Sequence, residues 1–455
     1  MAQSITMANA AYKKKWNRFT SSSFLTASDY ELLPGSNYRN FYTNMEPGYK
    51  FSNCTMIKGE EQIDYTASSK LSMTMGVGYE HYNAIPQSGD LDQPVNPRRY
   101  IQGTYLGTKA YYNPTGLRAQ FFSTTYNNTS AYYQVQYSPS SKVNITAGGR
   151  YDYNSRYGSS LNPRMGIVFQ PVKQTTIKLL FGTAFRAPSP SDSYSHYGSF
   201  NTPDSGRTYH SYFLHLPNPG LKPVKSLNTE LNISHRFSDN IAISLDAYYT
   251  ALRDLYTVAD DNLTTKLYNN IFNNISVDYI EVFVNRTKQE NFGGSIELNW
   301  RHNIGAINFR TTASISYVNA ILDGGVTDYN VVTKKMEADF ISPWMARIGT
   351  DIKIGKFTCS PRLLLMGRQR VPGISDTSGS VIKRQTLPGY ELLNISMAYQ
   401  LSNSISFSLT GSNVLDQRYK NVGFNMDLNS PQTAFYRGQP QDPIRIMAGL
   451  HFSLK

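Results

Sequence analysis

The sequence predicts an all-β protein that forms an antiparallel transmembrane β-barrel of about 20–22 strands. Apolar and polar residues alternate over segments of about ten residues along almost the whole chain, which is typical of strands with one apolar face. Tight turns separate some segments, whereas other connections, such as 186–226 and 253–291, are long and irregular. The 34 tyrosines are frequent at strand ends, as in the aromatic girdles of membrane proteins. We therefore expect short periplasmic turns and long extracellular loops.

The alternating segments follow one another from the first quarter of the chain to its end. Their length favours a membrane barrel, because tilted strands of about nine to eleven residues cross a bilayer, whereas soluble strands average about five or six. A propeller would need a repeated motif that the sequence does not show. The clearest segments are LSMTMGVGY (71–79), YQVQY (133–137), KVNITAGGRYDY (142–153), TELNISHRF (229–237), IAISLDAYY (241–249), SIELNWR (295–301), ARIGTDIKI (346–354) and SISFSLT (404–410).

The final segment, IRIMAGLHFSLK (444–455), shows the strictest alternation. Its even-numbered residues are all apolar, so we expect one face of this strand to contact lipid and the other to line the lumen. A spanning sheet in lipid must close, because an open edge leaves backbone groups without hydrogen bonds. The last strand is therefore predicted to pair with the first.

Composition and motifs exclude several classes of protein. No run of 18 apolar residues is present, so no helical membrane span is expected. The net charge of +12 is scattered, and no basic and aromatic stripe indicates nucleic-acid binding. The sequence shows no catalytic set of a nucleophile, a general base and a residue that orients the base. It also shows no phosphate-binding glycine loop, because Gly293-Gly294 opens a strand instead of a helix. We expect no enzymatic activity and no cofactor, and we interpret Cys54 and Cys359 as free thiols.

Four motifs in order resemble those of the TonB-dependent outer-membrane receptors, over roughly residues 40–455. The motifs are GRYDYNSRYGSSLNPRMGIVFQP (149–171), IKLLFGTAFRAPS (177–189), NPGLKPVKSLNTELNISHRF (218–237) and SNVLDQRY (412–419). The resemblance implies a 22-stranded barrel around an N-terminal plug, in the outer membrane of a Gram-negative bacterium. It also implies uptake of a scarce ligand that extracellular loops bind, driven by an energy-coupling TonB complex that pulls on the plug.

The chain departs from this family pattern at both ends. We expect residues 1–30 to be an N-terminal remnant, disordered or a partial strand, and residues 31–455 to form the receptor-like barrel. No signal peptide, plug or energy-coupling motif is recognised, so contact with the TonB complex would need a plug region absent here. The chain ends on Lys455 instead of the family's usual aromatic residue. We interpret the chain as a fragment.

Several functions remain open at this point. The ligand could be a siderophore, cobalamin, an oligosaccharide, a peptide or a metal chelate. Alternatives to the receptor are a passive porin without a plug, or a surface-binding outer-membrane protein. A soluble β-rich binding protein is a third alternative, which independence from detergent would reveal.

The segment 186–217 is the most ligand-like part of the sequence. Aromatic and polar side chains on an external loop suit ligand capture, although an ordinary loop with packed aromatics has the same composition. Three of the seven histidines lie here, but their spacing matches no zinc pattern, and no metal site is assigned. The predicted ligand-binding residues are Tyr194, His196, Tyr197, Phe200, Tyr209, His210, Tyr212 and His215.

Two further sets of polar residues are candidates for the lumen and the loops. The Asn-rich stretch LYNNIFNNIS (267–276) could bind a sugar or peptide, or simply end a strand. Arg347, Asp351 and Lys353 share one predicted lumen face, as do Glu297 and Arg301. Such charges would hold loops or a plug in place.

Overall fold

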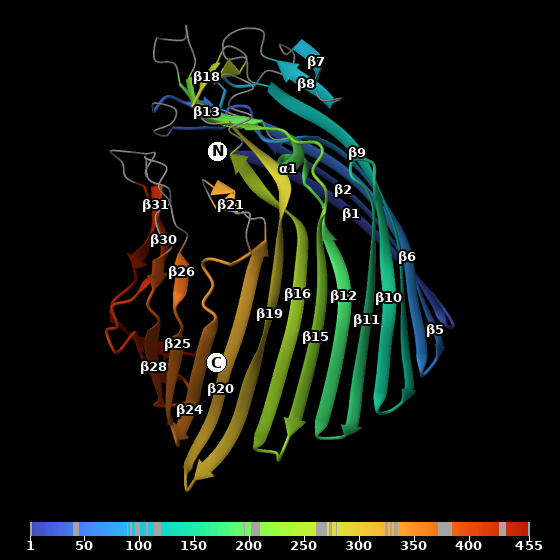
Figure 1. Cartoon of the computed structure of the whole chain (residues 1–455). Helices are drawn as coiled ribbons and strands as arrows, with labels where there is room; N and C mark the ends of the chain where they lie inside the picture. The colour runs from blue at the N-terminus through green and yellow to red at the C-terminus, as the bar shows by residue number, and fades with distance from the viewer. Residues whose placement is uncertain are drawn as a thin grey trace.

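The computed structural model shows one large curved sheet with smaller elements gathered at one end (Figure 1). It describes residues 2–453 except 40–44, 89, 92, 96–100, 106–107, 113–119, 195, 202–209, 261–270, 273–274, 279, 324–325, 328–329, 332–334, 372–384 and 427–433. The expected all-β, antiparallel barrel class is confirmed. In the described ranges, no helix is long and apolar enough to cross a membrane.

Seventeen long strands form the wall, each antiparallel to the next along the chain. They are β1 (Gln3–Trp16), β2 (Phe19–Leu32), β5 (Ser52–Ser68), β6 (Leu71–Ile85), β9 (Gln120–Ser140), β10 (Val143–Asn154), β11 (Gly158–Val172), β12 (Thr175–Arg186), β15 (Val224–Arg236), β16 (Ile241–Asp260), β19 (Ile280–Ile304), β20 (Ile307–Asp323), β24 (Trp344–Ile354), β25 (Phe357–Met366), β28 (Tyr390–Gln400), β29 (Ile405–Ser412) and β32 (Arg445–Phe452).

Short elements lie in the long connections. They are β3 (Asn37–Tyr38), β4 (Gly48–Tyr49), β7 (Ile101–Tyr105), β8 (Thr108–Tyr112), α1 (Pro190–Tyr194), β13 (Tyr197–Asn201), β14 (His210–Leu216), β17 (Ile271–Phe272), β18 (Ile275–Val277), β21 (Val326–Thr327), β22 (Asn330–Val331), β23 (Met336–Glu337), β26 (Gln369–Val371), β27 (Gln385–Leu387), β30 (Lys420–Met426) and β31 (Ala434–Pro440).

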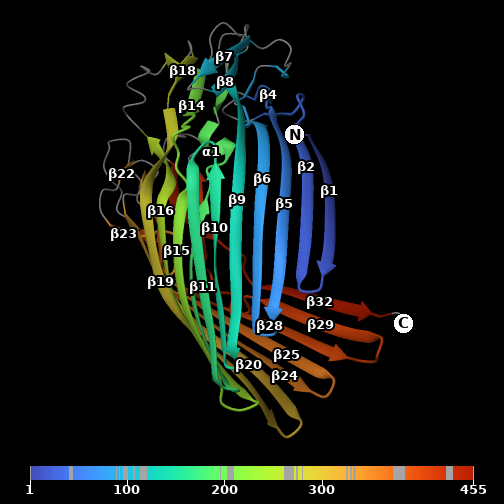
Figure 2. The ribbon, with the colours of Figure 1, turned by 90° about the vertical axis from the view of Figure 1, so that its right-hand side faces the viewer.

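The two ends of the wall differ as predicted. Two-residue turns join β1 to β2, β19 to β20 and β24 to β25, and each opens on a residue with positive φ: Asn17 (41°), Gly305 (57°) and Gly355 (53°). Hairpins this short favour such residues, because the turn must match the twist of the strands. The opposite end carries the long connections and their short elements (Figures 1 and 2).

The alternation also gives the wall an apolar outer face. Large apolar side chains remain exposed along nearly every long strand, which is the arrangement expected where lipid is the solvent. In the final strand, Ile446 is 66% exposed and Phe452 67% exposed. The prediction that this face does not pack on a protein core is therefore confirmed.

One expectation about the chain ends needs correction. In the described residues seventeen long strands form the wall, and the sheet that they share with short strands of the connections has 24 strands. Within the described residues β1 pairs only with β2, and β32 only with β29, so the predicted pairing of last with first strand is wrong. Before and across residue 30 the structure has β1 (Gln3–Trp16) and β2 (Phe19–Leu32), where the alternation of Ile5 and Met7 with polar neighbours continues the wall pattern. Lys455 lies outside the described residues.

The connections at the loop end pack into a small core, which we call the loop cap. β13 pairs antiparallel with β14, and β14 pairs in parallel with β18 and with the start of β19. These pairings bring together segments that are distant in sequence. Their side chains enclose a buried apolar cluster, which consists of Phe51, Leu91, Val95, Phe200, Leu214, Leu216, Val277 and Ile280. Cys54 and Cys359 are free thiols, as predicted.

Candidate ligand-binding site in the barrel lumen

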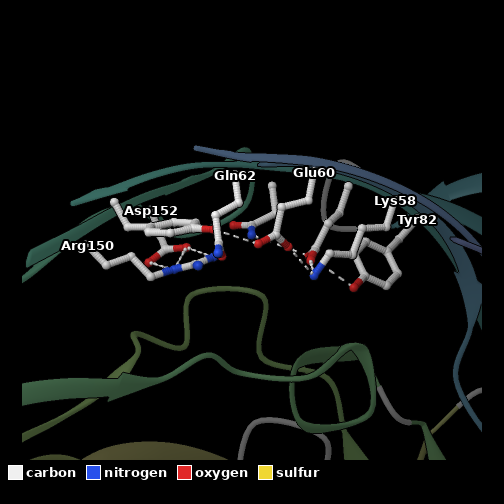
Figure 3. Close-up of polar contacts among 9 residues, drawn as sticks. Lys58, Glu60, Gln62, Tyr82, Arg150 and Asp152 are labelled. Atoms are coloured by element: carbon white, nitrogen blue, oxygen red, sulfur yellow. Dashed lines mark hydrogen bonds and ion pairs between the residues drawn. The ribbon is translucent and has the colours of Figure 1, made fainter. Parts of the chain in front are cut away.

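A row of polar side chains lines the inner face of β5, β6, β9 and β10 (Figure 3). The Lys58 ammonium lies between two carboxylates, with Nζ 3.1 Å from Glu60 Oε2 and 3.5 Å from Glu80 Oε1. Tyr82 donates a hydrogen bond to Glu80 (3.1 Å). The lysine thus binds two acids from different strands, as the period of two in each strand requires.

Tyr132 on β9 connects this row to its continuation on β10. Its hydroxyl lies 2.9 Å from Glu60 Oε1 and 3.1 Å from Gln62 Oε1, and both of these residues are on β5. The ring must cross β6 to reach them, and it does so over Gly76, where an added Cβ would lie 2.4 Å from the Tyr132 hydroxyl. Arg150, across from Tyr132 in the register, stacks on the ring at 5.7 Å.

Arg156 forms the second part of the site, which we call the arginine cage. It lies in the connection between β10 and β11, with its Nη2 donating to the carbonyl of Pro188 (2.7 Å). Three tyrosine rings surround the guanidinium, with centroids 4.2 Å (Tyr126), 6.0 Å (Tyr157) and 5.9 Å (Tyr194) from Cζ. Such contacts stabilise a cation. Burial raises the pKa of the Tyr157 phenol, against the opposing charge of Arg156.

Both parts face one cavity of about 880 Å³. Its volume is in the range of sites that hold small molecules. Within the described residues, Nε and Nη1 of Arg156 are buried and have no hydrogen-bond partner. The cavity therefore offers a partly unpaired cation, aromatic faces and carboxylates. It can bind a ligand that carries both anionic and aromatic groups.

The structure divides the eight loop residues that were predicted to bind a ligand. Tyr194, at the end of α1, contributes to the arginine cage. His196 (4% exposed), Phe200 and His215 (0% exposed) are buried in the loop cap instead. His215 Nδ1 lies 3.2 Å from Glu281, and His210 Nε2 lies 2.9 Å from Asp278, so both histidines tie β14 to the segment around β18 and β19. Tyr209 lies outside the described residues, as do the side chains of Tyr197 and Tyr212.

Sequence reasoning missed Arg156, Tyr126 and Tyr157. Arg156 and Tyr157 belong to the 149–171 motif, where an Arg-Tyr pair between two strands was a usable signal. Tyr126 gave no signal, since it is one of many tyrosines on wall strands. The part of the chain that the structure describes contains no group of three or more His, Cys, Asp or Glu residues suited to a metal ion.

Two of the other predicted lumen charges, Asp351 and Glu297, have polar partners. Asp351 pairs with Arg362 of β25 and accepts a hydrogen bond from Ser360 (2.7 Å). Glu297 accepts one from Asn299 (2.7 Å). Of the Asn-rich stretch, Ile271–Phe272 and Ile275–Val277 form strands, and 267–270 and 273–274 lie outside the described residues.

A buried ion pair joins segments of the loop end to one another. Lys50 Nζ lies 2.9 Å from Asp90 Oδ1, and the two side chains are 5% and 2% exposed. Burial lowers the pKa of Lys50, and the charge of Asp90 offsets part of this effect. The Tyr38 hydroxyl donates to the other Asp90 oxygen (2.9 Å). The backbone of Asp90 also bonds to Gly198 of β13 (3.1 Å), which joins three loop segments at one point.

These features define a class: an outer-membrane β-barrel with a polar lumen, a loop cap and a cavity for a small molecule. The family described as "TonB dependent receptor-like, beta-barrel" matches residues 3–414, and the chain belongs to this family. Its members are receptors and transporters of the outer membrane, which confirms the predicted class and location.

Two kinds of relative are similar to the chain. The "Iron-regulated outer membrane virulence protein" of Vibrio cholerae is 33% identical over 113 residues, which is 25% of this chain and 16% of that protein. The ferric enterobactin receptor PfeA of Pseudomonas aeruginosa has a TM-score of 0.63 at 13% identity, with 99% of this chain and 62% of that chain covered. The siderophore receptor PirA of Acinetobacter baumannii has a TM-score of 0.61 at 18% identity, with 99% and 63% covered. The chain thus spans less than two thirds of each relative.

Proposed function

We propose that the chain is the barrel part of a receptor that takes up a scarce ligand, and that this ligand is an anionic, aromatic iron chelate of the siderophore class. The observation that carries the proposal is the arginine cage, where Arg156 lines a cavity of about 880 Å³ and two of its buried guanidinium nitrogens have no protein partner. A catecholate-type chelate offers phenolate oxygens to Arg156 and ring faces to the tyrosines.

The relatives support the same class of ligand. PfeA is named for ferric enterobactin, PirA for a siderophore, and the Vibrio cholerae protein for its regulation by iron. Cobalamin, oligosaccharide and peptide fit the unpaired cation less well, because none of them presents a cluster of anionic aromatic oxygens.

Of the predicted loop residues, we propose that Tyr194 contacts the ligand and that His196, Phe200, His210 and His215 hold the loop cap above it. Tyr197, Tyr209 and Tyr212 are proposed as further ligand contacts. Transport through the barrel would depend on the TonB complex acting on a plug region. No catalytic role is proposed for any residue.

A binding titration tests the ligand class. The chain is purified in detergent, and quenching of its intrinsic fluorescence is measured with a ferric tris-catecholate and with an uncharged ferric trihydroxamate as the comparison chelate. We expect saturable binding of the catecholate. Arg156→Gln should weaken it about tenfold or more, since a charge-assisted hydrogen bond contributes about 1.5–3 kcal/mol.

Arg253→Gln is the matched control, because Arg253 is exposed on β16 and does not line the cavity. Equal affinity of wild type and Arg156→Gln for the catecholate would overturn the assignment of the cage. Preference for the trihydroxamate would overturn the ligand class.

The passive porin remains the alternative, and conductance separates it from the receptor. The loop cap packs a buried apolar cluster at one end of the lumen, which opposes a wide open pore. In a planar bilayer we therefore expect small or intermittent currents. Large, steady currents that the ferric catecholate does not change would favour the porin.

A further inference from the structure

The tight-turn end of the wall carries a ring of basic side chains. Five of its short turns each contain one exposed cation: Arg18, Lys70, Lys142, Lys173 and Lys356. Four of these turns join neighbouring strands between β1 and β12, and the fifth joins β24 to β25 on the other part of the wall (Figures 1 and 2). We call this set the basic ring.

The basic ring lacks acidic partners. None of its five members forms an ion pair with a carboxylate in the described ranges. The five turns themselves contain no acidic residue; Asp239 lies in a different tight turn, between β15 and β16. Arg18 and Lys356 donate to backbone carbonyls, of Ala67 (3.0 Å) and Leu401 (2.9 Å), which positions the charges without neutralising them.

The basic ring lies next to the lipid-facing belt. Exposed apolar side chains end the strands on either side of these turns, including Trp16, Phe19, Val172 and Ile354. Each is within three residues of a ring cation, so the cations stand where the hydrocarbon belt gives way to headgroups. Lys14 adds a charge here, with its Nζ 5.2 Å from the centre of the Trp16 ring.

We propose that the basic ring binds the phosphates of anionic phospholipids in the leaflet at the tight-turn end. The cations stand beside exposed apolar strand ends, and cations held beside an apolar belt attract anionic headgroups. The ring would fix the depth and orientation of the wall in that leaflet. This inference concerns the lipid contact and does not depend on the ligand of the lumen.

Tryptophan quenching can test the proposal at each end separately. Trp16 and Trp300 report on the tight-turn half, and Trp344 lies at the loop end of β24. The full chain carrying Trp344→Phe is reconstituted into two preparations of phosphatidylcholine vesicles. One contains dibrominated phosphatidylglycerol, and the other contains the same mole fraction of dibrominated phosphatidylcholine. We expect phosphatidylglycerol to quench more strongly, with a relative binding constant of about five.

Neutralising the basic ring should remove this preference. In the same background, Arg18→Gln, Lys70→Gln, Lys142→Gln, Lys173→Gln and Lys356→Gln together should bring the relative binding constant close to one. The matched control, Trp16→Phe with Trp300→Phe, leaves Trp344 and should show no preference. If the neutralised chain does not insert, the same charges are tested by adding 1 M KCl to the chain that retains its cations. The Debye length is then about 3 Å, and this screening should abolish the preference.

Two results would overturn the proposal. One is equal quenching by the two lipids in the chain that retains its cations, which would leave an acidic protein segment as the occupant of the rim. The other is a preference that survives neutralisation, survives high salt or is equally strong at Trp344.

Discussion

At the residue scale, small side chains decide where large ones can lie. Gly76 has no Cβ, and the Tyr132 ring uses that space to cross β6 and reach Glu60 and Gln62 on β5. The three strands are thereby linked on the lumen side by a side-chain contact in addition to their backbone ladder. Gly59, by contrast, has no atom within 4 Å of an added Cβ and serves no such contact.

A double-mutant cycle tests the role of Gly76. Gly76→Ala should displace Tyr132 and lower the free energy of unfolding by about 1 kcal/mol, the usual contribution of a hydrogen bond. Tyr132→Phe should cost a similar amount alone but little more in the Gly76→Ala chain, because the same bonds are already lost. Urea unfolding in detergent measures both, with Gly59→Ala as the neutral control. Fully additive losses would show that the glycine does not act through the tyrosine.

At the element scale, the contrast between hairpins and loops determines what each end can do. Two-residue turns with Asn or Gly at positive φ keep the tight-turn end short and regular. The loop end instead brings β14 in parallel to β18 and β19, an arrangement that needs long connections. Leu214 and Ile280 are opposite each other in this pairing, and both are fully buried.

Truncating this contact should loosen the loop cap and leave the wall intact. Leu214→Ala removes a fully buried side chain and should cost about 3 kcal/mol of local stability. We expect limited proteolysis to cleave the loop segments faster, while the far-ultraviolet β-sheet signal and the wall fragments are unchanged. Leu161→Ala, at a side chain that is 70% exposed, is the control. Unchanged cleavage rates would mean that the cap does not depend on this core.

At the scale of the whole molecule, the wall has two free edges. β1 and β32 each have a single described partner, whereas β9 in the middle of the wall pairs with both β6 and β10 along its length. Unpaired edges are costly in lipid, since backbone groups there have no water to bond with. The seventeen-strand wall therefore needs something at these edges to complete it in a bilayer.

Hydrogen exchange of the chain in detergent should show the free edges directly. About half of the β1 and β32 amides point away from their only partner strand, and we expect these to exchange at nearly the unprotected rate. Amides of β9 and β10 should be protected by comparison and serve as the internal reference. Uniform protection from β1 to β32 would show that the edges pair in solution, with each other or with a second copy.

The sequence by itself determined the class of protein, the antiparallel wall and the difference between its two ends. These follow from local rules: alternation with a period of two, and turn residues that tolerate positive φ. Only the tertiary structure decided that His196 and His215 are buried, because loops distant in sequence pack over them. It also decided that Arg156 meets Tyr126 and Tyr194, residues 30 and 38 positions away along the chain, because sheet register and loop docking set those distances. Neither the sheet register nor the docking of the loops is encoded in any short stretch of the chain.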